Sequence, residues 1–423
     1  MQNNCFPGAL SEWPMVPVSG LAEQNPRYPV RKGIDYPFIE MAAIGENFGG
    51  ILRIDARRLE GSGLSRFKAN DTLFAKITPC PENRKVAFVA SLPAEVGLGS
   101  TEFIVLSPRA GTDPRFLYHL ACSHALRGRA VARMEGSTGR QRVPEDVFDR
   151  RLLVPKPNED EQAAIARVLD AVDMAIERAQ DAVEKAQTTR LALIQAAFNF
   201  EMTSEARHDT DAGRIPQSWE ALKGKRAFSV LTGGNSSVYA LKPLRENDVA
   251  DAWFMKVDDF NLPANLRQIV TTQIGFVAAK NPSFKLLPVG TIIIAKRGAA
   301  ILKNRVRTTA VPIALDPNLM ALKVRDDILP EFFRYQLEWR NLARYVESSG
   351  VPQLNNKDLY PRWFVRAPED QQKEIVAVIS AAEKNEDALR SKLNALDALK
   401  KSLMHDLLTG TVRVDPALFK EQQ

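Results

Sequence analysis

Few side chains in this 423-residue chain have the types and spacing that catalysis or metal binding would need. His119, Cys122 and His124 place three soft metal ligands close together in the sequence. The segment is predicted to be helical, and on a helix these three spacings point to different faces. The other two histidines, His208 and His405, lie far away in the sequence. We therefore expect no metal to be bound by this chain.

Two further segments invite a catalytic interpretation. Residues 280–284 read KNPSF, which is distantly similar to the Asn-Pro-Pro-Tyr loop of amino-methyltransferases, but residues 46–50, ENFGG, do not form the glycine-rich cofactor loop that this chemistry also needs. Pro-Glu-Asp occurs at 144–146 and 368–370, near predicted helix starts, where acids favour the helix terminus. The chain has no GxxxxGK[ST] phosphate loop. We expect a non-catalytic chain that binds no cofactor itself.

The composition is that of an ordinary globular protein, with 45% hydrophobic and 26% charged residues, and it excludes wholesale disorder. No stretch approaches the ~18 apolar residues of a membrane span, and the first residues do not resemble a secretory signal. The three cysteines, Cys5, Cys80 and Cys122, cannot form a disulfide framework. These features predict a cytoplasmic protein of two or three domains without membrane contact.

Charge is distributed unevenly along the chain. The net charge is +5 over residues 1–157, −4 over 158–200, +7 over 201–367 and −2 over 368–423. Two large basic blocks therefore alternate with two short acidic ones. A polyanion such as DNA would be drawn to the basic blocks.

This alternation coincides with an internal repeat of about 205 residues, the feature to seek first in any sequence. Five matches occur in the same order in both copies. They pair Trp13 with Trp219, 73–76 (LFAK) with 293–296 (IIAK), 137–148 (STGRQRVPEDVF) with 348–359 (SSGVPQLNNKDL), 151–154 (RLLV) with 362–365 (RWFV), and 158–165 (NEDEQAAI) with 368–375 (PEDQQKEI).

Each copy ends in a long predicted helix. Residues 159–198 contain no Gly or Pro and are rich in good helix formers, and the segment that starts at 369 matches them. Asn158 or Asp160 can cap the first helix. Apolar residues recur every three or four positions in a narrow stripe, which is typical of a coiled-coil seam. The predicted seam comprises Ile165, Leu169, Val172, Ile176, Val183, Leu193, Ile375, Ile379, Leu389, Leu393, Leu396 and Leu403.

The connectivity favours antiparallel pairing of these helices. A forty-residue helix is roughly 60 Å long, and parallel pairing would need a connection of that length, whereas short connections are the rule. We predict an α+β protein with two repeated mixed α/β domains, separated by an antiparallel two-helix coiled coil with pseudo-twofold symmetry. The predicted parts are a first domain over 1–157, a helix over 158–200, a second domain over 201–367, a helix over 368–410 and a tail over 411–423.

Within the domains, strands are expected at 72–77, 86–90, 102–106, 290–296 and 320–324, and helices at 114–129 and 330–346, each with Pro at its start. The topology of each domain does not follow from these segments alone.

The basic blocks carry clusters that combine phosphate-seeking cations with amide side chains. Arg can pair with guanine, and Asn or Gln with adenine, so these clusters are candidates for DNA contacts. The loop at 353–356 parallels the one at 140–144 but carries different polar groups, as two readers of different half-sites would. The candidates are Lys76, Arg84, Lys85, Arg140, Gln141, Arg142, Lys296, Arg297, Arg305, Arg307, Gln353 and Asn355.

The layout and several motifs resemble the specificity subunit of type I restriction-modification systems. The similar pieces are GRIPQSW at 213–219, GLSRFKANDTLFAKITPC at 63–80, STEFIVL at 100–106, EDEQ and EDQQ at the helix starts, and KSL at 401–403 with LTG at 408–410. At 199–200 the first copy has Asn-Phe where the second has Thr-Gly, so the first helix departs from the pattern at its exit.

This resemblance implies two target-recognition domains that read the two halves of a split double-stranded DNA site. It also implies that the helix pair sets the gap between the halves. The expected partners are two methyltransferase subunits and restriction-translocase subunits, which would hold S-adenosylmethionine, ATP and Mg²⁺. Two alternatives stay open, a self-contained DNA adenine methyltransferase and a scaffold that does not bind DNA. Neither the target sequence, nor the gap length, nor the presence of a restriction subunit can be read from the sequence.

Overall fold

The computed structural model describes residues 13–137, 139–148, 152–231, 241–242, 244, 249–346 and 350–422. Cys5 and parts of the repeat matches, at Thr138, Arg151, Ser348 and Ser349, lie outside the described residues. The chain divides into two compact units. The first unit comprises Met1–Asp181 and Arg390–Gln423, and the second comprises Ala182–Leu389. Each unit includes part of both long helices, so this division does not test the predicted boundaries between domains and helices, which remain predictions.

The first unit is built on two four-stranded sheets with strand orders β2-β9-β6-β7 and β4-β3-β8-β5, and a two-stranded sheet, β1-β10. Its strands are β1 (Met15–Pro17), β2 (Ala22–Gln24), β3 (Asp35–Ile39), β4 (Asp55–Arg58), β5 (Ser65–Phe67), β6 (Thr72–Ala75), β7 (Val86–Phe88), β8 (Gly97–Gly99), β9 (Phe103–Pro108) and β10 (Leu153–Pro155). Its short helices are α1 (Val18–Leu21), η1 (Met41–Ala43), α2 (Pro114–Cys122), the π-helix η2 (His124–Gly128), α3 (Arg129–Ala132) and η3 (Glu145–Phe148).

The second unit has a five-stranded sheet, β14-β21-β18-β19-β16, a three-stranded sheet, β17-β15-β20, and two-stranded sheets β13-β22 and β11-β12. Its strands are β11 (Arg207–Thr210), β12 (Gly213–Pro216), β13 (Glu220–Lys223), β14 (Phe228–Leu231), β15 (Ala252–Met255), β16 (Gln268–Ile269), β17 (Ile274–Phe276), β18 (Ile292–Ala295), β19 (Val306–Thr309), β20 (Ile313–Leu315), β21 (Leu319–Val324) and β22 (Trp363–Arg366). Its short helices are α5 (Gly224–Ala227), η5 (Val257–Asn261), η6 (Pro263–Asn265), η7 (Ala278–Lys280), η8 (Ala299–Lys303), α6 (Pro330–Arg340), η9 (Leu342–Tyr345) and α7 (Asn356–Leu359).

The repeat in the sequence is a repeat in topology. The order β2-β9-β6-β7 recurs as β14-β21-β18-β19, and the pair β1-β10 recurs as β13-β22. In both units a parallel pair carries an antiparallel edge strand: β3 pairs with β8 and β4, as β15 does with β20 and β17. The units also differ, because β5 extends one sheet of the first unit and β16 extends the larger sheet of the second. The structure is therefore α+β, as predicted.

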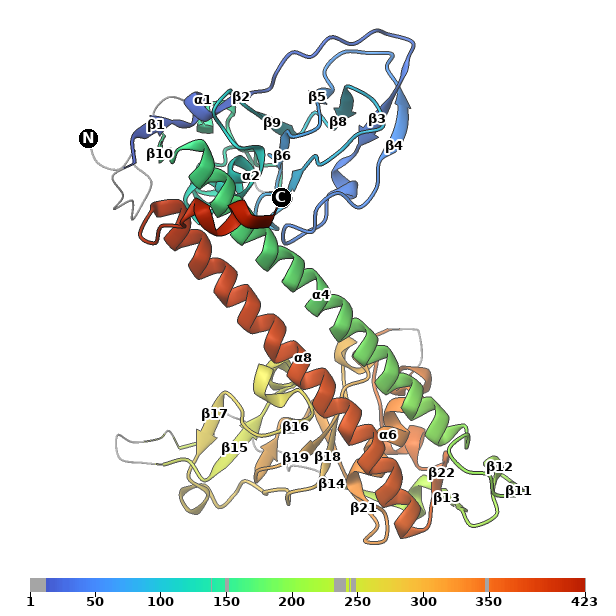
Figure 1. Cartoon of the computed structure of the whole chain (residues 1–423). Helices are drawn as coiled ribbons and strands as arrows, with labels where there is room; N and C mark the ends of the chain where they lie inside the picture. The colour runs from blue at the N-terminus through green and yellow to red at the C-terminus, as the bar shows by residue number, and fades with distance from the viewer. Residues whose placement is uncertain are drawn as a thin grey trace. The chain divides into compact units, whose positions relative to one another are not determined.

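The two long helices begin and end within two residues of their predicted limits: α4 spans Glu159–Phe198 and α8 spans Glu369–Thr409 (Figure 1). Asn158 caps α4, since its Oδ1 accepts a hydrogen bond from the Glu161 amide at 2.9 Å. A short 3₁₀ segment, η10 (Pro416–Gln422), follows α8. None of the helices within the described ranges is long and apolar enough to cross a membrane.

The predicted helices at 114–129 and 330–346 are shorter than expected, which corrects the sequence analysis. α2 ends at Cys122 because Ser123 is extended and its hydroxyl caps the next turn, accepting from the Leu126 amide at 3.2 Å. α6 ends at Arg340 because Asn341 adopts a positive φ of 58° and caps the following 3₁₀ turn. Asn and Ser compete locally for backbone hydrogen bonds, so both tend to interrupt helices.

Each unit closes its core around parts of both long helices. In the first unit, Ile165 and Leu169 at the beginning of α4 share a core with Leu407 and Leu408 at the end of α8. In the second unit, residues from Ile194 to Phe198 at the end of α4 share a core with Ile375 and Ile379 at the beginning of α8.

The predicted seam is buried only in part. Ile165, Leu169, Val183, Ile375 and Ile379 are buried. The remaining seam residues are half-buried, namely Val172, Ile176, Leu193, Leu389, Leu393, Leu396 and Leu403. The ends of the helices therefore belong to the cores of the domains.

Two glutamines fasten the helices to the domains in the same way. Gln162 is fully buried, accepts from the Asp113 amide at 2.9 Å and donates to the carbonyls of Gly111 and Pro157 at 3.2 and 2.8 Å. Gln372, the repeat-equivalent residue, accepts from the Leu329 amide at 2.8 Å and donates to two backbone carbonyls at 3.0 and 2.9 Å. Since both glutamines satisfy the same backbone groups, the junction of domain and helix is duplicated in detail.

Candidate nucleic-acid interface

In the first unit, a loop after α3 lies against the exit of strand β6. The Val143 amide donates to the Lys76 carbonyl at 2.8 Å, and the Thr78 amide donates to the Gln141 carbonyl at 3.0 Å. The loop is closed on itself by two hydrogen bonds between Glu135 and Arg142, at 2.8 and 2.9 Å. Lys76 is thereby brought beside Arg140, Gln141 and Arg142, which the sequence analysis selected as one cluster.

The second unit repeats this arrangement at strand β18. The Leu354 amide donates to the Lys296 carbonyl at 2.9 Å, and the Gly298 amide donates to the Pro352 carbonyl at 2.8 Å. Arg297 and Gln353 form an isolated antiparallel bridge, as residues 77 and 142 do in the first unit. Lys296, Arg297, Gln353 and Asn355 therefore form one group, and the two hydrogen bonds that attach this loop to the strand exit have counterparts in the first unit.

Several of the predicted DNA contacts have side chains that already brace the fold. Arg142 forms a bidentate pair with Glu102, with distances of 2.8 to 3.1 Å, and Lys76 lies 3.4 Å from a carboxylate oxygen of Glu145. The Glu102 carboxylate raises the pKa of Arg142. Lys85 donates to the Met41 carbonyl at 3.3 Å. These groups shape the loops that carry them.

Arg305 and Arg307, on or beside β19, also point into the fold. Arg305 donates to the Phe260 carbonyl at 3.0 Å and Arg307 to the Asn265 carbonyl at 3.1 Å. Burial lowers the pKa of Arg307 to about 10, against the opposing effect of Glu338. Both arginines hold the segment of η5 and η6 in place, a role that spacing in the sequence could not reveal.

Other candidates are exposed and accessible to a ligand. Arg140 and Arg297 are exposed, and no ion pair of either side chain occurs in the described part of the chain. Arg84 is exposed at the turn before β7, with its guanidinium 6.0 Å from the centroid of the Phe48 ring. Gln353 is exposed and donates to the Asn355 side chain at 3.2 Å. These residues are the accessible polar candidates on the loops and on the neighbouring strand ends.

The sequence analysis did not include Arg344, an exposed cation on η9. Asn304, at the end of η8, donates to the Glu338 carbonyl at 2.8 Å and accepts from the Leu342 amide at 2.9 Å, which places η9 beside η8. Arg344 is equivalent to Arg133, 211 residues earlier in the repeat, which lies 3.5 Å from Asp146.

The segments with catalytic-looking residues have structural roles. Asn281 donates to the Val277 carbonyl at 3.0 Å, and Phe284 is buried among Phe254 and Phe276, so KNPSF forms a turn that anchors an aromatic cluster. In the first Pro-Glu-Asp segment, Asp146 lies 3.5 Å from Arg133. Its acids therefore pair with cations of the same unit.

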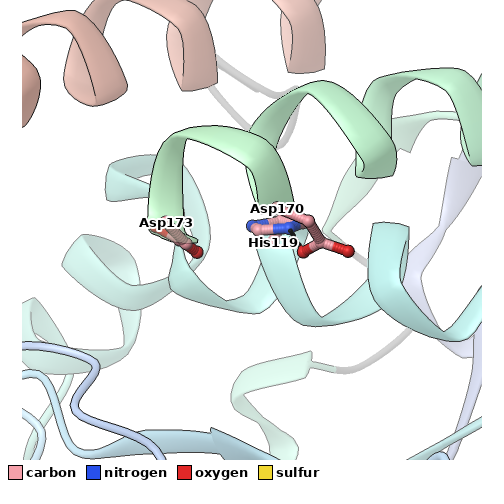
Figure 2. Close-up of side chains that lie close together, drawn as sticks. All are labelled: His119, Asp170 and Asp173. Carbon is pink, nitrogen blue, oxygen red and sulfur yellow. Dashed lines mark hydrogen bonds and ion pairs between the residues drawn. The ribbon is translucent and has the colours of Figure 1, made fainter. Parts of the chain in front are cut away.

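His119 does not group with Cys122 and His124; Cys122 is buried and His124 is exposed. Instead, the His119 Nε2 atom lies 2.7 Å from Asp170 Oδ1 on α4, with Asp173 one turn further along (Figure 2). Each carboxylate has a cation of its own, since Asp170 pairs with Arg115 and Asp173 pairs with Lys400. The cluster is therefore a charge-compensated junction between helices.

The ionisation of this junction follows from its surroundings. Burial lowers the pKa of His119, and its hydrogen bond to the Asp170 carboxylate only partly opposes this. Burial alone would raise the pKa of Asp170, but the hydrogen bonds from His119 and Arg115 lower it to about 2. A neutral imidazole therefore lies beside an ionised carboxylate.

Known proteins resemble this chain in sequence. No protein-family model matches it. The EcoAI specificity subunit of a type I restriction enzyme from Escherichia coli is 26% identical over 235 residues, which are 54% of this chain and 38% of that protein. The EcoEI specificity subunit from the same organism is 28% identical over the same shares of the two chains. The match spans well under half of both relatives.

A longer match is found in Methanocaldococcus jannaschii. The putative MjaX specificity subunit of a type I restriction enzyme is 22% identical over 395 residues, covering 90% of this chain and 88% of that protein.

Solved structures share the fold. The type I restriction-modification S subunit from M. genitalium aligns with a TM-score of 0.58 and 16% identity, covering 96% of this chain and 99% of that one. A chain from a study of complex assembly in the type I R-M system aligns with the same TM-score, 17% identity and the same coverage. The resemblance that the sequence motifs predicted, to specificity subunits of type I restriction-modification systems, is thus confirmed in sequence and in fold.

Proposed function

We propose that this chain is the specificity subunit of a type I restriction-modification complex and that each of its two repeated domains reads one half of a bipartite DNA site. The observation that carries this proposal is the pair of equivalent loops, 135–143 and 350–355, which the same backbone hydrogen bonds attach to the exits of β6 and β18. A duplicated frame that carries different side chains suits two related reading tasks with different targets.

In this proposal, the exposed cations of the loops contact phosphates and give an affinity that falls with salt. Arg84, Arg297 and Arg344 are suited to this contact because they are exposed. Base-edge contacts from the loops select the sequence. The bracing residues, such as Arg142 and Arg307, act by holding the loops in position.

We further propose that α4 and α8 form one antiparallel coiled coil that sets the gap between the two half-sites. Its support is the repeated pairing of an acid near the start of one helix with a cation near the end of the other. Asp173 pairs with Lys400 in the first unit, and Glu383 lies 3.6 Å from Arg190 in the second. In the repeat, Asp173 is equivalent to Glu383, and Arg190 to Lys400.

The chemistry would belong to the partners of this cytoplasmic complex. Two methyltransferase subunits would use S-adenosylmethionine, and restriction-translocase subunits would use ATP and Mg²⁺. This chain would contribute sequence choice and no bond-making step.

The test is to compare the methylated sites in a host with and without this chain. Loss of one bipartite adenine-methylation motif on deletion, and its return on complementation, is the expected result. Binding of labelled S-adenosylmethionine by the purified chain alone would point to a self-contained enzyme. An unchanged methylome, together with no DNA gel shift in the presence of the methyltransferase subunits, would leave only a scaffold role.

A further inference from the structure

The loops at the exits of β6 and β18 differ most at the residue directly after a glycine of positive φ. Gly139 has a φ of 79° and Gly350 a φ of 92°, a conformation that favours glycine. The next residue is Arg140 in the first unit and Val351 in the second, at equivalent positions of the repeat. Because the same hydrogen bonds hold the two loops, the two side chains occupy the same place in their own units.

Val351 is an unusual residue for such a place. Its exposed fraction is 78%, so an apolar side chain stands at the tip of the loop largely uncovered by the residues that the structure describes. Its surroundings are polar: Gln353 is exposed two residues later, and Arg297 lies on the segment to which the loop is hydrogen-bonded. A small apolar group flanked by an amide and a cation matches a thymine edge, where a methyl group lies beside polar base edges and phosphates.

Arg140 is suited to a different base. Its side chain is exposed, and within the described residues it has no acidic partner. Its neighbour Arg142 is held by Glu102, which fixes the backbone from which Arg140 projects. A free guanidinium on a fixed loop can donate two parallel hydrogen bonds to O6 and N7 of guanine.

We infer that this loop position selects a base in each half-site: Arg140 reads a guanine, and Val351 reads a thymine through its 5-methyl group. The inference rests on the proposed function and specifies which residue of each domain discriminates. It predicts that the two domains use opposite chemistry, hydrogen bonding in the first and apolar contact in the second, at one equivalent point of the fold.

The test uses the full chain in complex with its methyltransferase subunits and duplexes that carry the methylated site of the wild-type complex. In one series each thymine is replaced in turn by uracil, which removes only the 5-methyl group. In a second series each guanine is replaced by 7-deazaguanine, which removes only the N7 acceptor. Affinity is measured by fluorescence anisotropy.

For the wild-type complex, we expect one uracil substitution in one half-site to weaken binding about fourfold, the value of one buried methyl group. One 7-deazaguanine substitution in the other half-site should weaken binding roughly tenfold. Val351→Ala should abolish the uracil effect and keep the deazaguanine effect, and Arg140→Ala should do the reverse. Each half-site thus serves as the control for the other.

Two matched variants control for the loss of any exposed side chain. Val289→Ala truncates another valine of the second unit, 60% exposed, and Arg57→Ala truncates an exposed arginine on β4 of the first unit. Both should keep both base effects. Thermal unfolding confirms that the variants are folded, which is expected because the substituted residues are exposed.

Three results would overturn the inference. Base effects that persist at full size in Val351→Ala and Arg140→Ala would show that other residues read these bases. The absence of any uracil or deazaguanine effect in the wild-type complex would show that neither group is read. A weaker association with the methyltransferase subunits, with base effects unchanged, would mark the loop as a protein contact. All three leave a bipartite site in place, whereas failure of the proposed function would leave no bipartite site to test.

Discussion

In the first unit, the domain is attached to α4 through His119 and Asp170, whereas in the second unit the domain is attached to α8 through a network of arginines and acids. Tyr335 lies five residues after Pro330, the first residue of α6, as His119 lies five residues after Pro114, the first residue of α2, and the Tyr335 hydroxyl donates to Glu383 at 2.9 Å. Arg334 forms two hydrogen bonds with Glu383, at 2.8 and 3.1 Å. Arg190 and Arg267 join the same acids, with Glu386 2.7 Å from Arg267.

Glu383 and Glu386 in the second unit are more deeply buried than the acids of the first unit's junction. The Arg334 and Glu386 side chains are 3% exposed, against 27% for Asp170 and 25% for Asp173. Burial alone would raise the pKa of Glu383, but Arg334 and Arg267 hold it below its usual value. The backbone frame was thus retained in both copies, while the charges that fasten it to the helices diverged.

The largest effect is expected from Glu383→Ala. Removing this acid leaves Arg334 and Arg190 buried with one carboxylate fewer, at a cost of about 3 kcal/mol in the free energy of unfolding of the second unit. Hydrogen exchange, which resolves the two units, should show faster exchange in α6 and unchanged exchange in α2. The control is Glu369→Ala, an exposed acid on the same helix, which should change neither. Equal acceleration in both units would contradict the assignment of the network to one unit.

Gln162→Ala and Gln372→Ala should cost nearly the same, because the duplicated hydrogen bonds are the shared part of the two junctions. Each variant leaves buried backbone groups without a partner and should lose about 2 kcal/mol. Denaturant unfolding of each variant, with hydrogen exchange to locate the loss, measures the two values. A difference above ~1.5 kcal/mol would show that the frames are less alike than their bonds suggest.

The pH dependence should differ between the units because only the first buries a histidine at its junction. Since burial lowers the pKa of His119 from 6.5, the unfolded state binds more protons than the folded state as the pH falls below about 6.5. The contribution of His119 to the free energy of unfolding of the first unit is therefore fully present above about pH 6.5 and decreases as the pH falls toward the lower pKa of the folded state. The free energy of unfolding falls by at most about 1.4 kcal/mol per pH unit.

His119→Gln should flatten this dependence between pH 7 and pH 5. Asp170, Asp173 and Arg115 also face the site, but the pKa of Asp170, about 2, places its titration below this range. Hydrogen exchange at α2, measured across the pH range in both proteins, provides the readout. An equal slope in the variant would assign the dependence to other groups.

The smallest effect is expected from Lys400→Met, which removes the cation that pairs with Asp173. Lys400 is 12% exposed and also lies 5.1 Å from the Phe48 ring, a contact that methionine can replace in part. We expect the free energy of unfolding to fall by ~1 kcal/mol or less, far below the effect of Glu383→Ala. A loss comparable to that of Glu383→Ala would show that the two helix-pairing charges are equally important despite their different burial.

The sequence predicted the limits of the long helices better than which parts of the fold they contact. The limits of α4 and α8 followed from the absence of Gly and Pro, and the repeat was visible in short motifs because the frame is duplicated. The early ends of α2 and α6 were missed because they depend on single residues, Ser123 and Asn341, whose side chains cap the next turn. Apolar periodicity shows which face of a helix is buried but not whether a domain or a second helix covers it.

The candidate DNA contacts illustrate the same limit. Arg140 and Arg142 are indistinguishable by type, yet one is exposed and the other is held by Glu102, which lies forty residues away in the sequence. Arg305 and Arg307 are engaged with backbone carbonyls of another segment. Val351 was not selected at all, because an apolar residue in a loop carries no polar signal; only its exposure and its equivalence to Arg140 distinguish it.

The most direct test of the account lengthens both helices by four residues, between 181 and 182 in α4 and between 389 and 390 in α8, and determines the methylated motif in the host. Four residues add about 6 Å to a helix, close to the length of two base pairs of DNA at about 3.4 Å each. We predict the same two half-sites with a gap longer by about two base pairs. An unchanged gap, or half-sites of altered sequence, would contradict the claim that two separate readers are spaced by the helix pair.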